Sequence, residues 1–320
     1  MDSKTVRVDA DTVPDYTLRQ LEYFVAVADA GTVTGAAAKV HLSQSAMSTA
    51  ISELERTLGV QLVLRRHARG ITLTPAGSAL LAEARALLAQ ATDLEQHASH
   101  LGGEVAGAIS IGVFAILAPY VVPELLTRAA SELPALEVSA IEDSHDKLAE
   151  GLLAGLFELA LGYDLTDHPE LDKEVLGEVV PHVLLPAGHR LARRRKVALA
   201  ALATEPLVLL DLPHSRDYFA RLFEASGVTP WIRHRTHSAE LARALVARGG
   251  GYTVLNLRPR TDVSIEGLPY AVVPLDVDLS ATKAHLRLVL MRVAGSRRTR
   301  KADALAAVCR ASIPASMKQN

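Results

Sequence analysis

The sequence is poor in cysteine and in net charge, and its first fifteen residues contain no apolar run. Its 320 residues include one cysteine, Cys309, which excludes a disulfide framework and a peroxide-sensing cysteine pair and fits a reducing cytoplasm. The net charge of −2 argues against a protein that coats nucleic acid generally. Residues 1–15 are polar, with no apolar core for a signal peptide, and we expect a disordered arm there.

Signatures of enzymes, metal sites and membrane spans are also missing. The chain has no Gly-x-Ser-x-Gly, P-loop or Gly-x-Gly-x-x-Gly motif, so an enzyme is disfavoured and no cofactor is expected. A zinc site at His234 and His237 would lack a nearby cysteine or carboxylate at ligand spacing. The uncharged stretch 105–123 is long enough for a membrane span, but glycines and prolines interrupt it. We read 108–113 as a buried parallel strand and Pro119 as the first-turn proline of the next helix.

The most informative part of the sequence is residues 16–77. The spacing of small, capping and apolar residues there predicts three short helices and a wing. The second helix begins at Thr34, and its alanines at 36–38 let another helix cross closely, with Ala37 at the crossing. Ser43 or Ser45 caps the third helix, which ends at Gly59. Helical spacing predicts that one stripe of the third helix is buried, made of Ala46, Met47, Ile51, Leu54 and Leu58.

Polar side chains off that stripe are candidates for reading base edges in a major groove, although a helix face of this kind can also be merely solvated. Two apolar stretches after Gly59 bracket a run of arginines, which indicates a two-stranded wing able to reach phosphates and the minor groove. The predicted DNA-binding residues are Thr34, Ser43, Gln44, Ser45, Ser48, Thr49, Arg65, Arg66 and Arg69.

Residues 18–77 resemble the winged helix-turn-helix of LysR-type transcriptional regulators. The resemblance rests on Leu21-Glu-Tyr-Phe-Val-Ala-Val, an Ala-Ala pair, Leu42-Ser-Gln-Ser-Ala-Met-Ser, Leu54-Glu, Leu58-Gly-Val-Gln-Leu and Leu73-Thr-Pro-Ala-Gly. It implies that Gln44, Ser45 and Ser48 contact bases. The chain departs from the family at Thr49, where a basic residue is common, and at Val63, where phenylalanine is usual.

A heptad seam follows the wing, because Leu80, Leu87, Leu94 and Leu101 are each seven residues apart. This pattern favours a linker helix, within residues 75–103, that pairs with a copy of itself, although the helix could instead pack on its own domain. A dimer places two reading heads on paired half-sites. The resemblance implies the same dimer, commonly assembled into a tetramer.

From residue 104 onward, strand-like and helical runs alternate, so we expect a mostly parallel α/β fold. Two lobes are predicted: lobe I from 104–180 with 279–312, and lobe II from 181–278, followed by a tail at 313–320. The region resembles the effector domain of the same family, an architecture shared with periplasmic solute-binding proteins (type 2). An exported binding protein would need a signal peptide, and a molybdate-type regulator would carry a smaller, mainly β sensor.

Ligands in such sheets bind at strand ends, near helix N-termini that favour anions. Serines at 144, 215 and 238 each cap the start of a predicted helix, with histidines beside them, and Phe114-Ala-Ile116 forms an apolar wall. These features predict an effector that is an organic acid with an apolar or aromatic part. The candidate effector-binding residues are Phe114, Ala115, Ile116, Ser144, His145, His214, Ser215, Arg216, His237 and Ser238.

The resulting expectation is a cytoplasmic regulator, not an enzyme, that binds operator DNA under control of a small anionic effector. Its expected partners are double-stranded DNA, the effector, further copies of itself and RNA polymerase, with no metal, cofactor or membrane. The effector is expected to close the lobes and change how the heads engage the operator.

Overall fold

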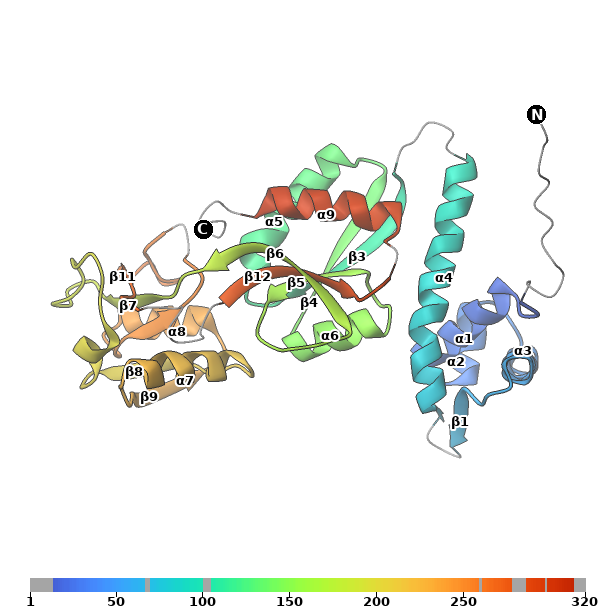
Figure 1. Cartoon of the computed structure of the whole chain (residues 1–320), viewed down its shortest axis with the longest axis horizontal. Coiled ribbons are helices and arrows are strands. Elements are labelled where there is room, and N and C mark those ends of the chain that lie inside the picture. Colours follow the sequence, from blue (N-terminus) through green and yellow to red (C-terminus); the bar gives the residue numbers. More distant parts are fainter. Residues whose placement is uncertain are drawn as a thin grey trace.

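The computed structural model describes residues 14–66, 70–99, 105–258, 261–277, 286–296 and 298–313. Three parts follow one another along the chain (Figure 1): a helical head, one long helix and a body of two α/β lobes. The predicted arm at 1–15 and tail at 313–320 lie almost wholly outside the described residues. None of the helices described is both long and apolar enough to cross a membrane.

The head consists of three helices and a two-stranded wing, namely α1 (Leu18–Ala30), α2 (Val33–Lys39), α3 (Gln44–Leu58), β1 (Val63–Arg66) and β2 (Gly70–Leu73). Side-chain caps start each helix: the Ser43 hydroxyl accepts from Ala46 N at 3.1 Å and thereby begins α3. Thr32 caps α2, which begins one residue before the predicted Thr34. Gly59 ends α3 in the left-handed conformation.

Packing of α3 against α1 and α2 buries most of the predicted stripe. Met47, Ile51 and Leu54 are at most 2% exposed, and Ala36 and Ala37 are buried under the crossing. The expectation that Ala46 is buried is wrong, because Ala46 is exposed; Ala38 is exposed as well, so only Ala36 and Ala37 lie under the crossing. Ala46 lies in the first turn of α3, where Gln44 and Ser45 are exposed as well, so helical spacing alone does not bury it.

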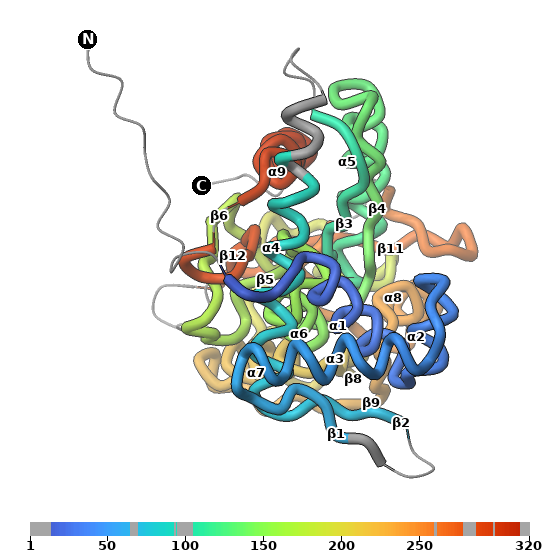
Figure 2. Tube along the Cα trace, turned by 90° about the vertical axis from the view of Figure 1, so that its right-hand side faces the viewer, coloured from blue at the N-terminus to red at the C-terminus, as the bar shows by residue number. Residues whose placement is uncertain are grey.

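Helix α4 (Pro75–Ser99) connects the head to the body. Leu81 and Ala84 are buried in the head core, whereas Arg85 reaches lobe I. Leu87 and Leu94 lie on a third face and remain 37% and 71% exposed. Leu101, the fourth residue of the seam, lies outside the described residues. Figure 2 shows α4 and the head in front of the body, with the wing at one end.

Lobe I is a five-stranded sheet of order β4-β3-β5-β12-β6, with helices on both faces. Its elements are β3 (Gly107–Phe114), α5 (Ala118–Glu132), β4 (Leu136–Asp143), α6 (His145–Leu153), β5 (Leu159–Tyr163), β6 (Leu171–Val179), β12 (Leu286–Val293) and α9 (Arg300–Ser312). Strand β3 pairs in parallel with β4 and β5, as predicted, and Pro119 lies in the first turn of α5.

Lobe II contains a three-stranded sheet, β10-β7-β11, and a parallel pair, β8-β9. Its elements are β7 (His182–Pro186), the short helix η2 (Leu199–Leu202), β8 (Pro206–Leu210), α7 (Ser215–Ala225), β9 (Trp231–Thr236), α8 (Ala239–Ala247), β10 (Thr253–Leu255) and β11 (Tyr270–Pro274). The chain crosses between the lobes after β6 and returns to lobe I in β12.

The expectation of mostly parallel pairing is only partly right. Strand β12 is antiparallel to both β5 and β6, and β7 is antiparallel to β10 and β11. Strand β12 is the segment in which the chain returns from lobe II, and it enters the sheet of lobe I in the opposite direction to β5 and β6.

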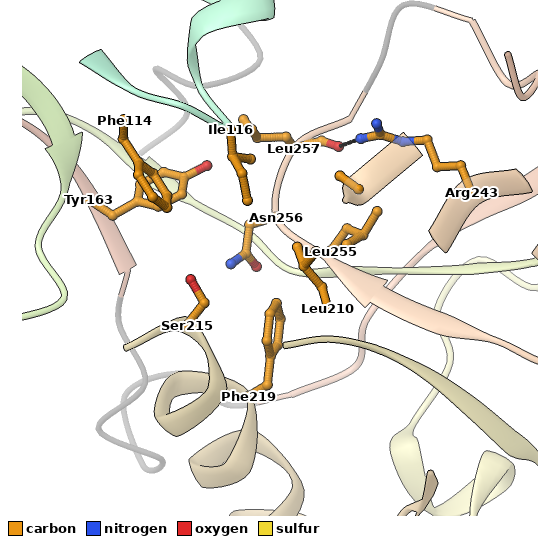
Figure 3. A pocket seen from close by; sticks show the side chains of 11 residues that line it. Phe114, Ile116, Tyr163, Leu210, Ser215, Phe219, Arg243, Leu255, Asn256 and Leu257 are labelled. Carbon is orange, nitrogen blue, oxygen red and sulfur yellow. Dashed lines mark hydrogen bonds between the residues drawn. The ribbon is translucent and has the colours of Figure 1, made fainter. Parts of the chain in front are cut away.

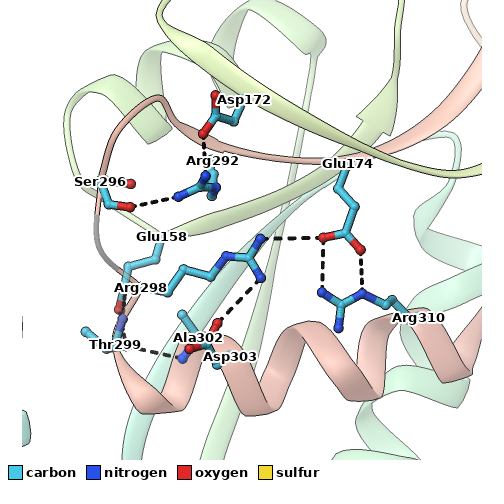
Figure 4. A network of polar contacts seen from close by, with 10 residues as sticks. All are labelled: Glu158, Asp172, Glu174, Arg292, Ser296, Arg298, Thr299, Ala302, Asp303 and Arg310. Carbon is cyan, nitrogen blue, oxygen red and sulfur yellow. Dashed lines mark hydrogen bonds and ion pairs between the residues drawn. The ribbon is translucent and has the colours of Figure 1, made fainter.

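Ion pairs attach the edge strand β6 to α9 (Figure 4). Glu174 accepts from Arg310 Nη2 at 3.0 Å and from Arg298 Nη2 at 3.5 Å. The hydrogen bond from Arg310 is the main cause that lowers the pKa of Glu174. At the start of α9, the Glu158 carboxylate accepts from the Thr299 backbone and hydroxyl.

Candidate DNA-binding surface and effector cleft

The exposed face of α3 carries the predicted base-reading residues. Gln44, Ser45 and Thr49 are exposed and Ser48 is half-buried. Two of the hydroxyls are already engaged locally: Ser45 Oγ lies 3.0 Å from Ser43 Oγ, and Thr49 Oγ1 donates to the Ser45 carbonyl at 3.0 Å. These bonds orient the first turn of α3, the part that enters a major groove in such motifs.

The polar surface continues one turn further than the sequence analysis predicted. Ser48 and Thr49 share a shallow hollow with Ser52, Glu53 and Arg56. Spacing of four and seven residues from Ser48 and Thr49 is the signal that could have identified Ser52 and Arg56.

The wing is fixed to α3 by the carboxylate of Glu55, which sequence analysis did not single out. One oxygen of this carboxylate accepts from the backbone N–H groups of Leu62 and Val63, at 2.8 and 3.0 Å. Strands β1 and β2 are antiparallel, with Arg65 opposite Ile71 and Arg66 opposite Gly70. The side chains of Arg65 and Arg66, and all of Arg69, lie outside the described part of the structure. Thr34 is exposed on α2.

A pocket lies between the two lobes (Figure 3). Its volume is about 20 Å³, little more than one water molecule needs. Lobe I contributes three residues and lobe II the rest: Phe114, Ile116, Tyr163, Leu210, Ser215, Phe219, Ala239, Arg243, Leu255, Asn256 and Leu257.

Three of the predicted effector-binding residues, Phe114, Ile116 and Ser215, line this pocket. His145 lies behind its wall, with its ring 4.3 Å from the Phe114 ring. His145 Nε2 accepts from the Tyr163 backbone N–H at 3.3 Å. Burial lowers the pKa of His145 to about 4, so the ring is neutral at pH 7 and accepts this bond.

His214, the residue before the pocket residue Ser215, joins the two lobes. Its Nε2 lies 2.7 Å from Asp146 Oδ1, at the start of α6 in lobe I. His214, not Ser215, is the residue before α7, with φ of +61°. The expectation that Ser215 caps α7 is therefore wrong: it is the first helical residue. A non-glycine residue held at positive φ stores strain, which is common at binding sites. We call the His214–Asp146 pair the lobe clasp.

The other predicted effector residues surround the pocket without lining it. Arg216 pairs with Asp211, as does Arg235. Ser144 precedes α6 but makes no side-chain cap bond, whereas the Ser238 hydroxyl caps α8 by accepting from Leu241 N. Ala115 begins the turn after β3, and His237 is exposed. Within the described residues no cluster of three metal-ligating side chains occurs.

Comparison with known proteins supplies the decisive observation. Residues 18–78 match the bacterial regulatory helix-turn-helix of the lysR family, and residues 102–313 match the LysR substrate binding domain. The chain belongs to the LysR family of transcriptional regulators.

Relatives of this LysR-type regulator span most of its length. A probable hydrogen peroxide-inducible genes activator of Mycobacterium avium is 33% identical over 257 residues, covering 78% of this chain and 80% of the relative. The regulator TfdS of Cupriavidus pinatubonensis is 33% identical, with 74% and 81% covered. The crystal structure of HinK, a LysR family regulator from Pseudomonas aeruginosa, is 34% identical with a TM-score of 0.62, covering 93% and 98% of the two chains.

Family membership gives this regulator a DNA-binding head and an effector-binding domain, and the family is non-enzymatic. The head is built on α3 and the wing, and the two-lobed body is the effector-binding domain. Tyr163, Arg243 and Asn256 are pocket residues of this domain that sequence analysis missed. They come from strand ends and a helix in both lobes, so no single stretch of sequence marks them.

Proposed function

We propose that this LysR-type regulator reads a specific operator with α3 and the wing, and that a small organic acid bound between the lobes modulates this reading. The observation that carries the proposal is a pocket lined by both lobes, in a body that contacts the head through α4. The apolar wall at Phe114 and Ile116 favours an acid with an apolar or aromatic part. We also propose a cytoplasmic location, with RNA polymerase as a further partner.

Pairing through α4 is part of the proposal. Leu81 and Ala84 face the head and Arg85 faces lobe I, which leaves Leu87 and Leu94 without a described partner in this chain. Large exposed apolar side chains at heptad spacing are typical of a helix that packs against another copy. A homodimer, or a tetramer built from two, would place two heads on paired half-sites.

Helix α6 is the proposed route from the effector to the head. Its first turn contains His145, against the pocket wall, and Asp146 of the lobe clasp. At its other end, the Ala154 carbonyl accepts from Arg85 of α4, and Arg85 also donates to Asp29 of α1. A helix of nine residues spans about 14 Å as a rigid unit. Movement of the lobes against each other would therefore displace α4 and the head together.

Replacement of Ser48 with alanine tests the reading function. We expect the variant to lose about 1–2 kcal/mol of discrimination between operator and random DNA, roughly a factor of 5–30, because a base-edge contact is removed. Competition gel shifts measure this ratio. Ser131→Ala, on an exposed site of lobe I, is the matched control. If Ser48→Ala discriminates between operator and random DNA as well as the wild type does, Ser48 does not contact bases.

Several relatives carry names that refer to hydrogen peroxide, so peroxide sensing is the competing proposal. Cys309, the single cysteine of the chain, is buried on α9. Burial raises the pKa of its thiol to about 12, so the reactive thiolate is scarce at neutral pH. These features favour a bound effector over thiol oxidation.

We therefore expect Cys309 in the folded protein to react with a thiol reagent far more slowly than in the urea-unfolded chain. Operator binding should be the same before and after peroxide treatment, and Cys309→Ser should behave as the wild type. The measurements are thiol titration and gel shift. Peroxide that changes operator binding of the wild type but not of Cys309→Ser would favour thiol sensing instead.

A further inference from the structure

Three polar side chains gather at one end of a pocket whose other described walls are hydrocarbon apart from Arg243 (Figure 3). Tyr163 ends β5 in lobe I, Ser215 begins α7 in lobe II, and Asn256 follows β10. Figure 3 shows all three on the side of the pocket near Phe114, whereas Arg243 lies on the other side, beyond Leu257. The remaining walls are apolar, formed by Phe114, Ile116, Leu210, Phe219, Ala239, Leu255 and Leu257.

The Tyr163 hydroxyl is buried and has no hydrogen-bond partner among the described residues. Tyr163 as a whole is 4% exposed, and burial raises the pKa of its phenol well above the ordinary value, so the group remains a donor. The Asn256 carboxamide has one long hydrogen bond, from Tyr218 Oη at 3.4 Å. An unpaired buried donor destabilises a fold, and a ligand that accepts from it explains why the hydroxyl is there.

The charges around the pocket favour an anion. Among the described residues that line it there is no aspartate or glutamate. Arg243 is 2% exposed and its Nε has no partner among the described residues, while its ion-pair partner Glu240 is 52% exposed. Solvent screens the carboxylate more than the buried guanidinium, so the pocket experiences a net positive potential. The N-terminal turn of α7, where Ser215 lies, adds to it.

The size of the pocket limits the ligand. A volume of about 20 Å³ admits only the end of a small acid until the lobe clasp opens. If the rest of the ligand is compact and apolar, the lobes need to separate least to admit it, and it replaces water against the hydrocarbon walls. A second carboxylate on the ligand would have to reach Arg243 past these apolar walls, and short of it would be desolvated without a donor, at a high cost.

We propose that Tyr163, Ser215 and Asn256 bind the carboxylate of a compact, apolar monocarboxylic acid, and that this acid is the effector class of the regulator. The inference rests on the proposed function for its regulatory meaning. The binding claim stands on the pocket alone and can be tested without DNA.

The test titrates the full-length protein with isobutyrate, isobutyramide and succinate at constant ionic strength, with heat of binding and melting temperature as readouts. Isobutyrate should bind and raise the melting temperature, and the other two should bind at least about tenfold more weakly, since hydrogen bonds to a charged group are the stronger ones. Tyr163→Phe should weaken isobutyrate binding about tenfold or more. It should not lower the melting temperature of the unliganded protein, because no hydrogen bond within the protein is lost.

Tyr252→Phe is the matched control. The Tyr252 hydroxyl is also buried without a partner among the described residues, but Tyr252 does not line the pocket. This variant should bind isobutyrate as the wild type does. The proposal is overturned if isobutyrate fails to bind, if the amide binds as well as the acid, or if Tyr163→Phe and Tyr252→Phe behave alike. Binding that depends on Tyr163 but leaves operator affinity unchanged would retain the pocket assignment and refute effector control.

Discussion

Replacing Arg85 with alanine is expected to abolish effector control of DNA binding while leaving effector binding and basal DNA binding intact. Arg85 is the side chain that joins three parts: it lies on α4, donates to Asp29 in the head and donates to the Ala154 carbonyl at the end of α6. Its side chain is 11% exposed. Gly155, at φ of +66°, allows this approach, since an added Cβ would lie 3.0 Å from Arg85 Cβ.

In the wild type, the ratio of operator affinities with and without effector is expected to be roughly 5–150-fold, because the coupling free energy between two sites is usually about 1–3 kcal/mol. In Arg85→Ala this ratio should approach one. Operator affinity measured by fluorescence anisotropy, with and without saturating acid, gives the ratio directly. Arg128→Ala is the control, because Arg128 pairs only within α5 among the described residues. A full effector response in Arg85→Ala would rule out this route.

Replacing Gly77 with alanine is expected to unfold or distort the head and to weaken binding to all DNA sequences. An added Cβ at Gly77 would lie 2.1 Å from the Leu62 carbonyl oxygen, and backbone cannot move aside as a flexible side chain can. The same oxygen accepts from Thr74 N at 3.0 Å, and Thr74 Oγ1 accepts from Gly77 N at 2.9 Å. The junction of the wing and α4 therefore depends on the close approach of Gly77 to the Leu62 carbonyl.

Overpacking of this kind costs about 1–3 kcal/mol, and more where nothing can relax. The melting transition of the head should shift down accordingly, and affinity for operator and random DNA should fall together. Ser78→Ala, at the next and exposed position of α4, should have almost no effect. Wild-type stability in Gly77→Ala would show that the close approach to Leu62 does not exist in solution.

The head was largely predictable from sequence because local signals determine it. Capping by Ser43, the left-handed Gly59, and the buried Met47, Ile51 and Leu54 all follow from residue type and helical spacing. The link from Glu55 to the wing was missed, because a carboxylate that accepts from backbone seven and eight residues away leaves no periodic pattern.

In the body, the alternation of strands and helices along the chain was predictable, but the pairing of the strands within the sheets was not. Strand β6 was missed because this edge strand carries Lys173 and Glu174, which pair with Asp164 and Arg310 instead of forming an apolar run. Strand β11 was not predicted either, because it has only five residues and follows a loop rich in turns.

The pocket between the lobes, which is the proposed effector site, was only partly predictable. Phe114, Ile116 and Ser215 lie at element ends that a two-lobed fold brings together, so sequence analysis reached them. From sequence alone, Tyr163 is indistinguishable from the other residues of a buried strand, and Asn256 from an ordinary loop residue. Only the tertiary arrangement reveals that the Tyr163 hydroxyl has no partner among the described residues. The lobe clasp between Asp146 and His214 likewise joins residues 68 positions apart.

The most direct test of the central claim is to select, from a pool of random duplex DNA, the molecules that the full-length protein retains, and to sequence them. We predict enrichment of one motif with two related half-sites, spaced about one helical turn (10–10.5 base pairs) or a multiple of it apart, and loss of that enrichment in Ser48→Ala. A retained pool with the same sequences as the input would contradict sequence-specific reading, and with it the proposed function.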